Sequence, residues 1–171
     1  MQTKPASSVW FTASAMGCIY GILISIHAWL GLFTNIELND WLVLNNILFI
    51  SLLISLAVMG FLFRRRGVSL HTLTGAVILC AIIWGILFMI TYIVCTTLFV
   101  DQAVQIAFFK RDYVYHGYKS VAEALSVNNN AVELIKLQVF SLAISLIFQW
   151  GSLIFGVTLS KIKSSKRLLE A

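Results

Sequence analysis

The stretch Phe63-Arg64-Arg65-Arg66-Gly67 separates two long apolar stretches, neither of which contains Lys, Arg, Asp or Glu. An arginine at the centre of a membrane-spanning helix costs about 2.5 to 3.5 kcal/mol on insertion scales. The triplet is therefore expected to stay at a membrane surface, while the apolar stretches beside it are too apolar for water. This pattern predicts a turn at a membrane surface between two transmembrane helices.

The composition of the whole chain supports a membrane protein. Of its 171 residues, 60% are hydrophobic and 11% are charged, and the mean hydropathy is +0.92. A soluble domain of this size cannot bury so much apolar surface, whereas a bilayer accepts it. The net charge of +5 comes from bases that flank apolar stretches. Anionic membrane lipid is therefore the expected partner, and no nucleic-acid partner is expected.

The apolar stretches predict an all-α fold with four transmembrane helices, arranged as two hairpins in a single domain covering residues 1–171. The predicted spans cover residues of about 9–33, 41–63, 72–100 and 137–160, with an extracytoplasmic segment at about 101–136. Residues 118–127 can form a short helix. Asn130 and Glu133 resemble an N-cap and a first-turn acid, which predicts that the last helix begins near Ala131 and continues to about Ile162.

The distribution of bases predicts the orientation. Most Lys and Arg residues fall on the side that holds both termini and the arginine triplet, whereas nearly all acidic residues fall on the other side. Cytoplasmic loops carry the excess of Lys and Arg. Both termini and the triplet are therefore expected in the cytoplasm.

Small residues recur at helical spacing in the first span. Ala13, Gly17, Gly21 and Ser25 follow one another every fourth residue and so share one face of a helix. Such a face lets a second helix approach closely. These four residues are predicted to form a helix-packing surface, with the partner helix left open between this chain and another copy.

A polar stripe is expected on the last span. Gln149 lies near its middle, and the other members of the stripe are Ser141, Ser145, Ser152 and Gly156. A stripe of this kind lines a polar path or joins helices by hydrogen bonds, and helix packing is the favoured interpretation. Trp84 and Trp150 lie too deep for the membrane interface and are expected to pack inside the bundle.

Groups that could carry chemistry are scarce in the spans. All twelve Lys and Arg residues and all seven Asp and Glu residues lie outside the four predicted spans. Proton-coupled and ion-coupled transporters usually place such a group at membrane depth, and intramembrane metal sites need clustered ligands. No metal or cofactor site is therefore predicted. His27 is the titratable side chain that stands out in a span, with packing favoured over a functional role.

The best candidate site is a cluster of bases on the predicted cytoplasmic side. Its members are Arg64, Arg65, Arg66, His71, Lys161, Lys163, Lys166 and Arg167. Each base near an anionic leaflet contributes about 1 kcal/mol, and guanidinium groups bind phosphate well. The cluster is either a set of ordinary positive-inside anchors or a dedicated site for phosphate-bearing headgroups.

The overall layout resembles a known family. The features that carry the resemblance are four spans, the basic turn after the second span, the sequence Arg66-Gly67-Val68-Ser69 before the third, a polar extracytoplasmic segment and a short Lys/Arg tail. This pattern resembles small four-helix bacterial inner-membrane proteins that are catalogued only as a domain of unknown function. The resemblance implies a multi-pass protein of the bacterial inner (cell) membrane and assigns no activity.

The leading functional hypothesis is a non-enzymatic integral membrane accessory or assembly subunit. It would pack through its small-residue helix faces into a homo-oligomer or a larger membrane complex, with the basic cluster contacting anionic lipid headgroups. The alternative is a small oligomeric transporter, channel or lipid-handling protein for a phosphate-bearing ligand, which would use the Gln149 stripe or the basic cluster. An intramembrane enzyme is disfavoured because the spans lack paired polar groups.

Overall fold

Four long helices dominate the part of the chain that the structure describes, which is residues 4–34, 38–98, 123 and 131–169 of a computed structural model. They are α1 (Lys4–Phe33), α2 (Leu38–Arg65), α3 (Leu70–Leu98) and α7 (Ala131–Leu169). Each contains a stretch long and apolar enough to cross a membrane, namely Ser7–Gly31, Leu42–Arg65, Leu70–Cys95 and Val139–Ile162. The prediction of an all-α fold with four such helices is confirmed.

The first three helices begin about two to five residues before the predicted spans, and the last helix extends past its predicted C-terminus. The last helix begins at Ala131, as the Asn130 cap predicts, but it continues to Leu169 and so includes the basic tail. Cations in the final turns of a helix interact favourably with its dipole, which favours this extension. The short helix expected at 118–127 lies outside the described residues apart from Glu123.

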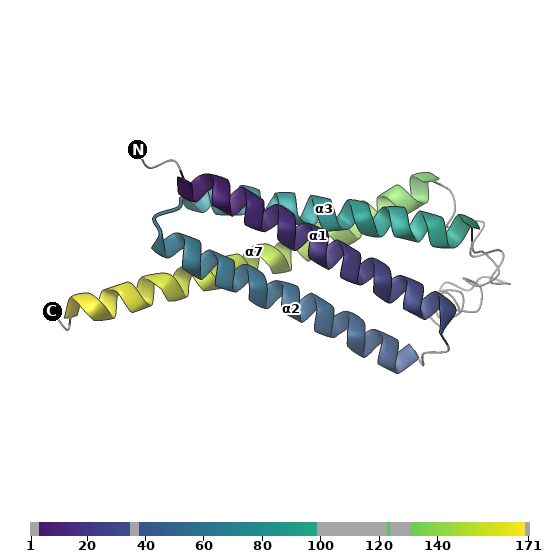
Figure 1. Cartoon of the computed structure of the whole chain (residues 1–171), viewed down its shortest axis with the longest axis horizontal. Coiled ribbons are helices and arrows are strands. Elements are labelled where there is room, and N and C mark those ends of the chain that lie inside the picture. The colour runs from purple at the N-terminus through teal and green to yellow at the C-terminus, as the bar shows by residue number, and fades with distance from the viewer. Residues whose placement is uncertain (1–3, 35–37, 99–122, 124–130, 170–171) are drawn as a thin grey trace.

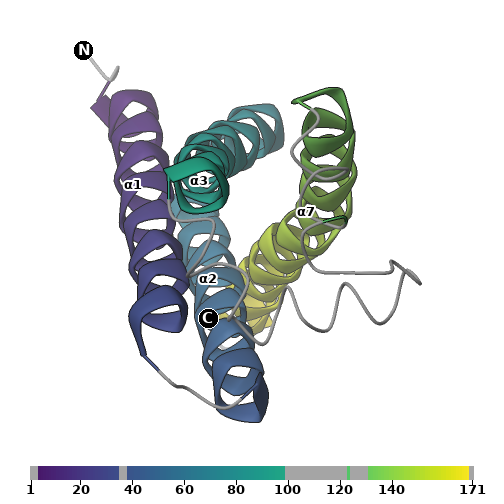
Figure 2. The same ribbon diagram turned by 90° about the vertical axis from the view of Figure 1, so that its right-hand side faces the viewer.

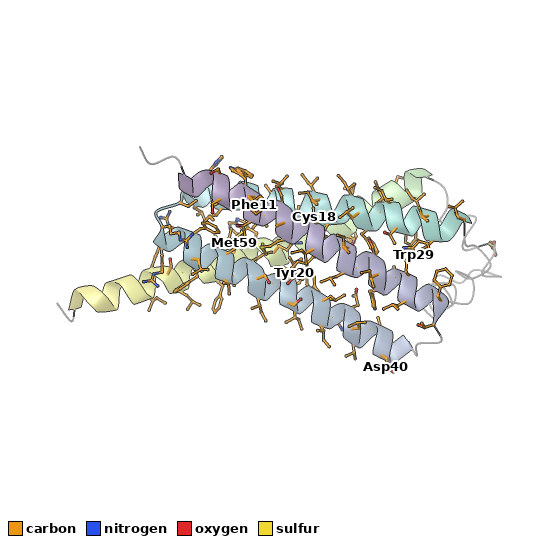
Figure 3. The ribbon with its side chains drawn as sticks, in the orientation of Figure 1. Phe11, Cys18, Tyr20, Trp29, Asp40 and Met59 are labelled. Atoms are coloured by element: carbon orange, nitrogen blue, oxygen red, sulfur yellow. The ribbon has the colours of Figure 1, made fainter. Side chains whose placement is uncertain are left out.

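The four helices alternate in direction along the bundle. α1 and α3 run one way, and α2 and α7 run the other, so the N-terminus, the α2–α3 turn and the C-terminus share one end (Figure 1). The end-on view places α1 and α7 on opposite sides of the molecule, with α2 and α3 between them (Figure 2). Asp40, in the first turn of α2, lies at the other end (Figure 3).

The core of the bundle draws on all four helices. Its fully buried apolar side chains include Val9 of α1, Leu52 and Leu56 of α2, Leu73 of α3 and Leu153 of α7. The outer faces are apolar as well and carry exposed isoleucines along every helix. Outward-facing apolar side chains of this kind suit hydrocarbon, because lipid tails are as apolar as the side chains themselves.

Helix pairing differs from the two hairpins expected from the sequence. The largest interfaces are α1 with α3 and α2 with α7, which are helices that do not follow one another in the chain. The consecutive pairs α1–α2 and α2–α3 touch much less. The physical reason is that the glycines that allow close backbone approach face these non-consecutive partners, as Gly17 does toward α3 and Gly156 does toward α2.

Candidate functional site at the arginine end

The candidate site lies at the end of the bundle that holds the α2–α3 turn, here called the arginine end. The N-terminal part of α1 and the C-terminal part of α7 lie at this same end (Figure 1). The end of α2, the start of α3 and the end of α7, which carry the bases predicted to converge, therefore lie at one end of the bundle.

The turn between α2 and α3 is closed by two complementary helix caps. The N–H of Val68 donates to the Phe63 carbonyl at 3.1 Å, and the N–H of Gly67 donates to the Arg64 carbonyl at 3.0 Å. This is the Schellman pattern, and it requires a left-handed residue, which Gly67 supplies with φ of 81°. Phe63 and Val68 occupy the two positions that form the apolar contact of this motif, and both are buried. The turn is consequently short and well determined.

Ser69 begins the next helix directly after that cap. Its hydroxyl oxygen accepts a hydrogen bond from the N–H of Thr72 at 3.1 Å, which is the N-cap arrangement. The Ser69 and Thr72 hydroxyl groups also lie 2.8 Å apart. With both helix ends capped, hydrogen bonds fix the backbone of the residues between them.

The three arginines of the turn have different surroundings. Arg64 is half-buried, and its Nη1 donates to the carbonyl of Val68 at 2.9 Å, so part of its guanidinium is used to hold the turn. Arg65 and Arg66 are exposed. Their guanidinium carbons lie 5.4 Å and 5.5 Å from the ring centres of Phe61 and Phe63, respectively. Such stacking orients the cations and leaves their N–H groups available to an anion.

The remaining predicted bases are placed along the same end. His71 is exposed in the first turn of α3, and Lys161 is exposed near the end of the α7 span. Lys163, Lys166 and Arg167 belong to the last turns of α7, and their side chains lie outside the described residues.

The predicted small-residue face of α1 lies against α3. Ala13 is fully buried. A Cβ added to Gly17 would lie 2.8 Å from the carbonyl oxygen of Cys80, and one added to Gly21 would lie 3.2 Å from the Cα of Trp84. At the fourth position, Ser25 accepts a hydrogen bond of 2.7 Å from the Thr91 hydroxyl. The partner helix that the sequence left open is therefore α3 of the same chain.

The residues of the predicted polar stripe on α7 do not all lie on one face in the structure. Ser145 and Gln149 are buried, and Gly156 lies so close to α2 that an added Cβ would run into the Ala57 carbonyl. Ser152 donates to the carbonyl of Leu53 at 2.5 Å. Ser141, in contrast, is exposed and does not share the buried face.

Several packing residues were not found from the sequence, or were placed differently. Gly60 lies against the backbone of α7, with its would-be Cβ 2.7 Å from the Leu153 carbonyl oxygen. The Tyr20 hydroxyl and Ser55 share a hydrogen bond of 2.9 Å between α1 and α2. Trp150, expected inside the bundle, is 48% exposed, and its indole N–H donates to Thr74 at 3.3 Å. His27 is buried.

The described residues offer no cluster of His, Cys, Asp or Glu that could hold a metal ion. Together, the helices and the arginine end define a small helical protein with four candidate membrane spans and a basic surface at the end that holds both termini. No protein-family model matches this chain. Searches of curated proteins and of solved structures likewise find no match.

Proposed function

We propose that this protein is a non-enzymatic accessory or assembly subunit of a bacterial cell membrane, anchored at the cytoplasmic leaflet through its arginine end. The observation that carries the proposal is the placement of Arg65 and Arg66. Both are exposed on a doubly capped turn, with their cations stacked on phenylalanine rings. A rigid turn of this kind loses little side-chain freedom when it binds an anionic lipid headgroup.

The positions of the other bases support the same assignment. The exposed His71 and Lys161 add to the basic surface at the end that holds both termini. Asp40 and Glu133 belong to the first turns of α2 and α7, and the starts of these two helices lie at the opposite end of the bundle (Figure 1). This asymmetry matches the positive-inside rule and favours the arginine end on the cytoplasmic side.

Gln149 favours the accessory role over the alternative of a transporter or channel that uses its stripe. Its side chain is fully buried and hydrogen-bonded to Ser145 on its own helix. A residue that lines an aqueous path needs exposure to that path. The burial of Gln149 therefore supports a packing role for this face of α7.

Lipid binding by the double variant Arg65→Gln/Arg66→Gln tests the proposal. Arg64 is retained because it donates to the Val68 carbonyl and holds the turn. The orientation is locked by a fused cytoplasmic domain, and association of the purified protein with nanodiscs containing phosphatidylglycerol is compared with neutral nanodiscs. At about 1 kcal/mol per base, the loss of two bases is expected to weaken binding of the anionic lipid roughly 30-fold.

Two controls separate specific from general effects. The variant Arg65→Lys/Arg66→Lys retains the charge and should keep most of the binding, with any loss measuring the contribution of the guanidinium forks. Lys136→Gln removes one exposed base at the other end and should weaken binding less than the double variant does. If Arg65→Gln/Arg66→Gln binds anionic lipid as the native chain does, the proposed role of the arginine end is wrong.

The subunit role has its own test. Purification in mild detergent is expected to recover the protein in more than one copy or together with another membrane protein. A monodisperse monomer that purifies alone would contradict this part of the proposal.

A further inference from the structure

Among the residues that the structure describes, two buried polar side-chain atoms have no hydrogen-bond partner. They are Oε1 of Gln149 on α7 and Nε1 of Trp84 on α3. Gln149 is 0% exposed, and its Nε2 donates to Ser145 Oγ at 2.8 Å. Exchanging the amide oxygen and nitrogen would satisfy the oxygen and leave the nitrogen unpaired instead. In either orientation, the amide retains an unused hydrogen-bonding group.

The alignment of α3 with α7 indicates that the Trp84 and Gln149 side chains lie at similar positions along the bundle axis. The helices run antiparallel (Figure 1), and two contacts set their alignment. Thr74 accepts the hydrogen bond from Trp150, and a Cβ at Gly85 would lie 2.8 Å from Leu142. Advancing along α3 from Thr74 to Gly85 therefore corresponds to moving back along α7 from Trp150 to Leu142.

The tilt of helical side chains shortens the remaining distance between the Trp84 and Gln149 side chains along the bundle axis. Side chains in an α-helix lean toward its N-terminus. Gln149 leans back to Ser145, as its hydrogen bond shows. By the same rule, the side chain of Trp84 is expected to lean toward the level of Cys80. Because the two helices are antiparallel, the two side chains tilt in opposite directions along the bundle axis. Their polar ends therefore approach each other. Trp84 also packs against the same core cluster that contains Cys80 and Leu153.

We infer that Trp84, Gln149 and Ser145 form an intramembrane site for one neutral hydroxyl group, supplied by a water molecule or by an alcohol. A hydroxyl both donates and accepts, so its oxygen can accept from the Trp84 indole N–H while its proton goes to the Gln149 amide. A buried water typically makes about three hydrogen bonds, and Trp84, Gln149 and Ser145 offer that number of partners. A charged ligand is disfavoured because no countercharge is present on these side chains.

This site is independent of the proposed role of the arginine end, which uses none of its residues. Leaving polar groups unpaired in a hydrocarbon environment is costly. A hydroxyl group that forms hydrogen bonds with both Trp84 and Gln149 would therefore be bound firmly. It would also link α3 to α7, whose interface is smaller than those of α1 with α3 and α2 with α7. A polar bridge at this depth would therefore stabilise one of the less extensive contacts of the bundle.

Indole N–H resonances of the full-length protein in nanodiscs test the inference. The tryptophans are labelled with nitrogen-15, and the Trp84 and Trp150 signals are assigned from Trp84→Phe and Trp150→Phe. The expected result is a through-space cross-peak from the Trp84 indole proton to a hydroxyl-bearing molecule. The near-isosteric variant Gln149→Met should move the Trp84 signal upfield and abolish that cross-peak.

A matched control uses the other tryptophan of this interface. Thr74→Val removes the acceptor for Trp150 and should move the Trp150 signal while leaving that of Trp84 in place. Adding a short-chain alcohol then identifies the source of the hydroxyl. A cross-peak to water alone indicates a bound water, and one to the methylene protons indicates an alcohol; either result supports the site.

The inference is overturned by either of two results. One is a folded native protein in which the Trp84 indole proton shows no cross-peak to water or to alcohol. The other is a cross-peak that persists unchanged in Gln149→Met. If Gln149→Met does not fold, the presence or absence of the cross-peak in the native chain decides the question.

Discussion

Among the glycines that contact a neighbouring helix, Gly156 makes the closest approach, and its partner is α2. An added Cβ there would collide with the backbone of Ala57, and Gly60 makes the reciprocal approach toward the Leu153 carbonyl. Backbone atoms cannot yield as the end of a flexible side chain does. Close contact of this kind increases the van der Waals attraction that holds helices together in lipid, where the hydrophobic effect does not distinguish helix from lipid.

Replacing Gly156 with Val should therefore separate α2 from α7. We expect a loss of about 1 to 3 kcal/mol in the free energy of unfolding, as is typical of overpacked contacts. Gly151 on the same helix is the matched control, because an added Cβ there meets nothing within 4 Å. Gly151→Ala should leave stability unchanged or raise it by about 0.5 to 1 kcal/mol through the lower entropy cost of alanine in a helix.

Unfolding of both variants in mixed micelles, followed by circular dichroism, measures the difference. Equal stability of Gly156→Val and the native protein would show that the α2–α7 contact is absent from the folded chain.

The pairing of α1 with α3 is the element-scale feature that distinguishes this bundle from two simple hairpins. It depends on steric contact at Gly17 and Gly21 and on the hydrogen bond between Ser25 and Thr91. Interhelical hydrogen bonds in membranes average only about 0.6 kcal/mol. Close backbone contact is therefore expected to contribute more to this interface than the hydroxyl pair does.

A disulfide between α1 and α3 tests this pairing directly. Ser25 and Thr91 direct their hydroxyl groups at each other with 2.7 Å between the oxygens. In a background in which Cys18, Cys80 and Cys95 are replaced by Ala, Ser25→Cys combined with Thr91→Cys should cross-link rapidly under mild oxidation in membranes. The product is detected by gel mobility after cleavage of the chain between the two helices.

Ser25→Cys combined with Ile90→Cys is the control for that experiment, since Ile90 is 52% exposed and faces away from the core. A cross-link that forms equally well in both pairs, or in neither, would contradict the observed packing of α1 on α3.

At the scale of the whole molecule, both termini and the α2–α3 turn share one end, and the start of α7, the helix that carries Lys136, lies toward the other (Figure 1). Because the chain crosses from end to end four times, one orientation determines the side of every connection. The larger number of bases at the arginine end favours the cytoplasmic side for it.

Thiol labelling of sealed cells measures that orientation. In the cysteine-free background, a membrane-impermeant reagent should modify Lys136→Cys from outside. It should modify Arg66→Cys and Lys161→Cys only after the membrane is opened. The reverse pattern would contradict the predicted orientation, and labelling of Arg66→Cys and Lys161→Cys on opposite sides would contradict the fold itself.

The sequence by itself determined the number of long apolar helices, the turn that follows the second of them, and the start of α7 at Ala131. These features are local, because hydropathy, helix caps and left-handed glycines depend on residues close together in the chain. Individual packing positions on α1 were also predictable, since small residues at four-residue spacing must share a face.

Only the tertiary structure decided which helices pair, that Ser141 and Trp150 are exposed, and that Arg64 is partly used in holding the turn. In a membrane bundle, every helix is apolar all round, so hydropathy does not distinguish a lipid-facing side from a partner-facing side. Which side faces a partner helix depends on how closely two backbones can approach each other. This distance depends on the shapes of both helix surfaces, so the sequence of one helix does not determine it.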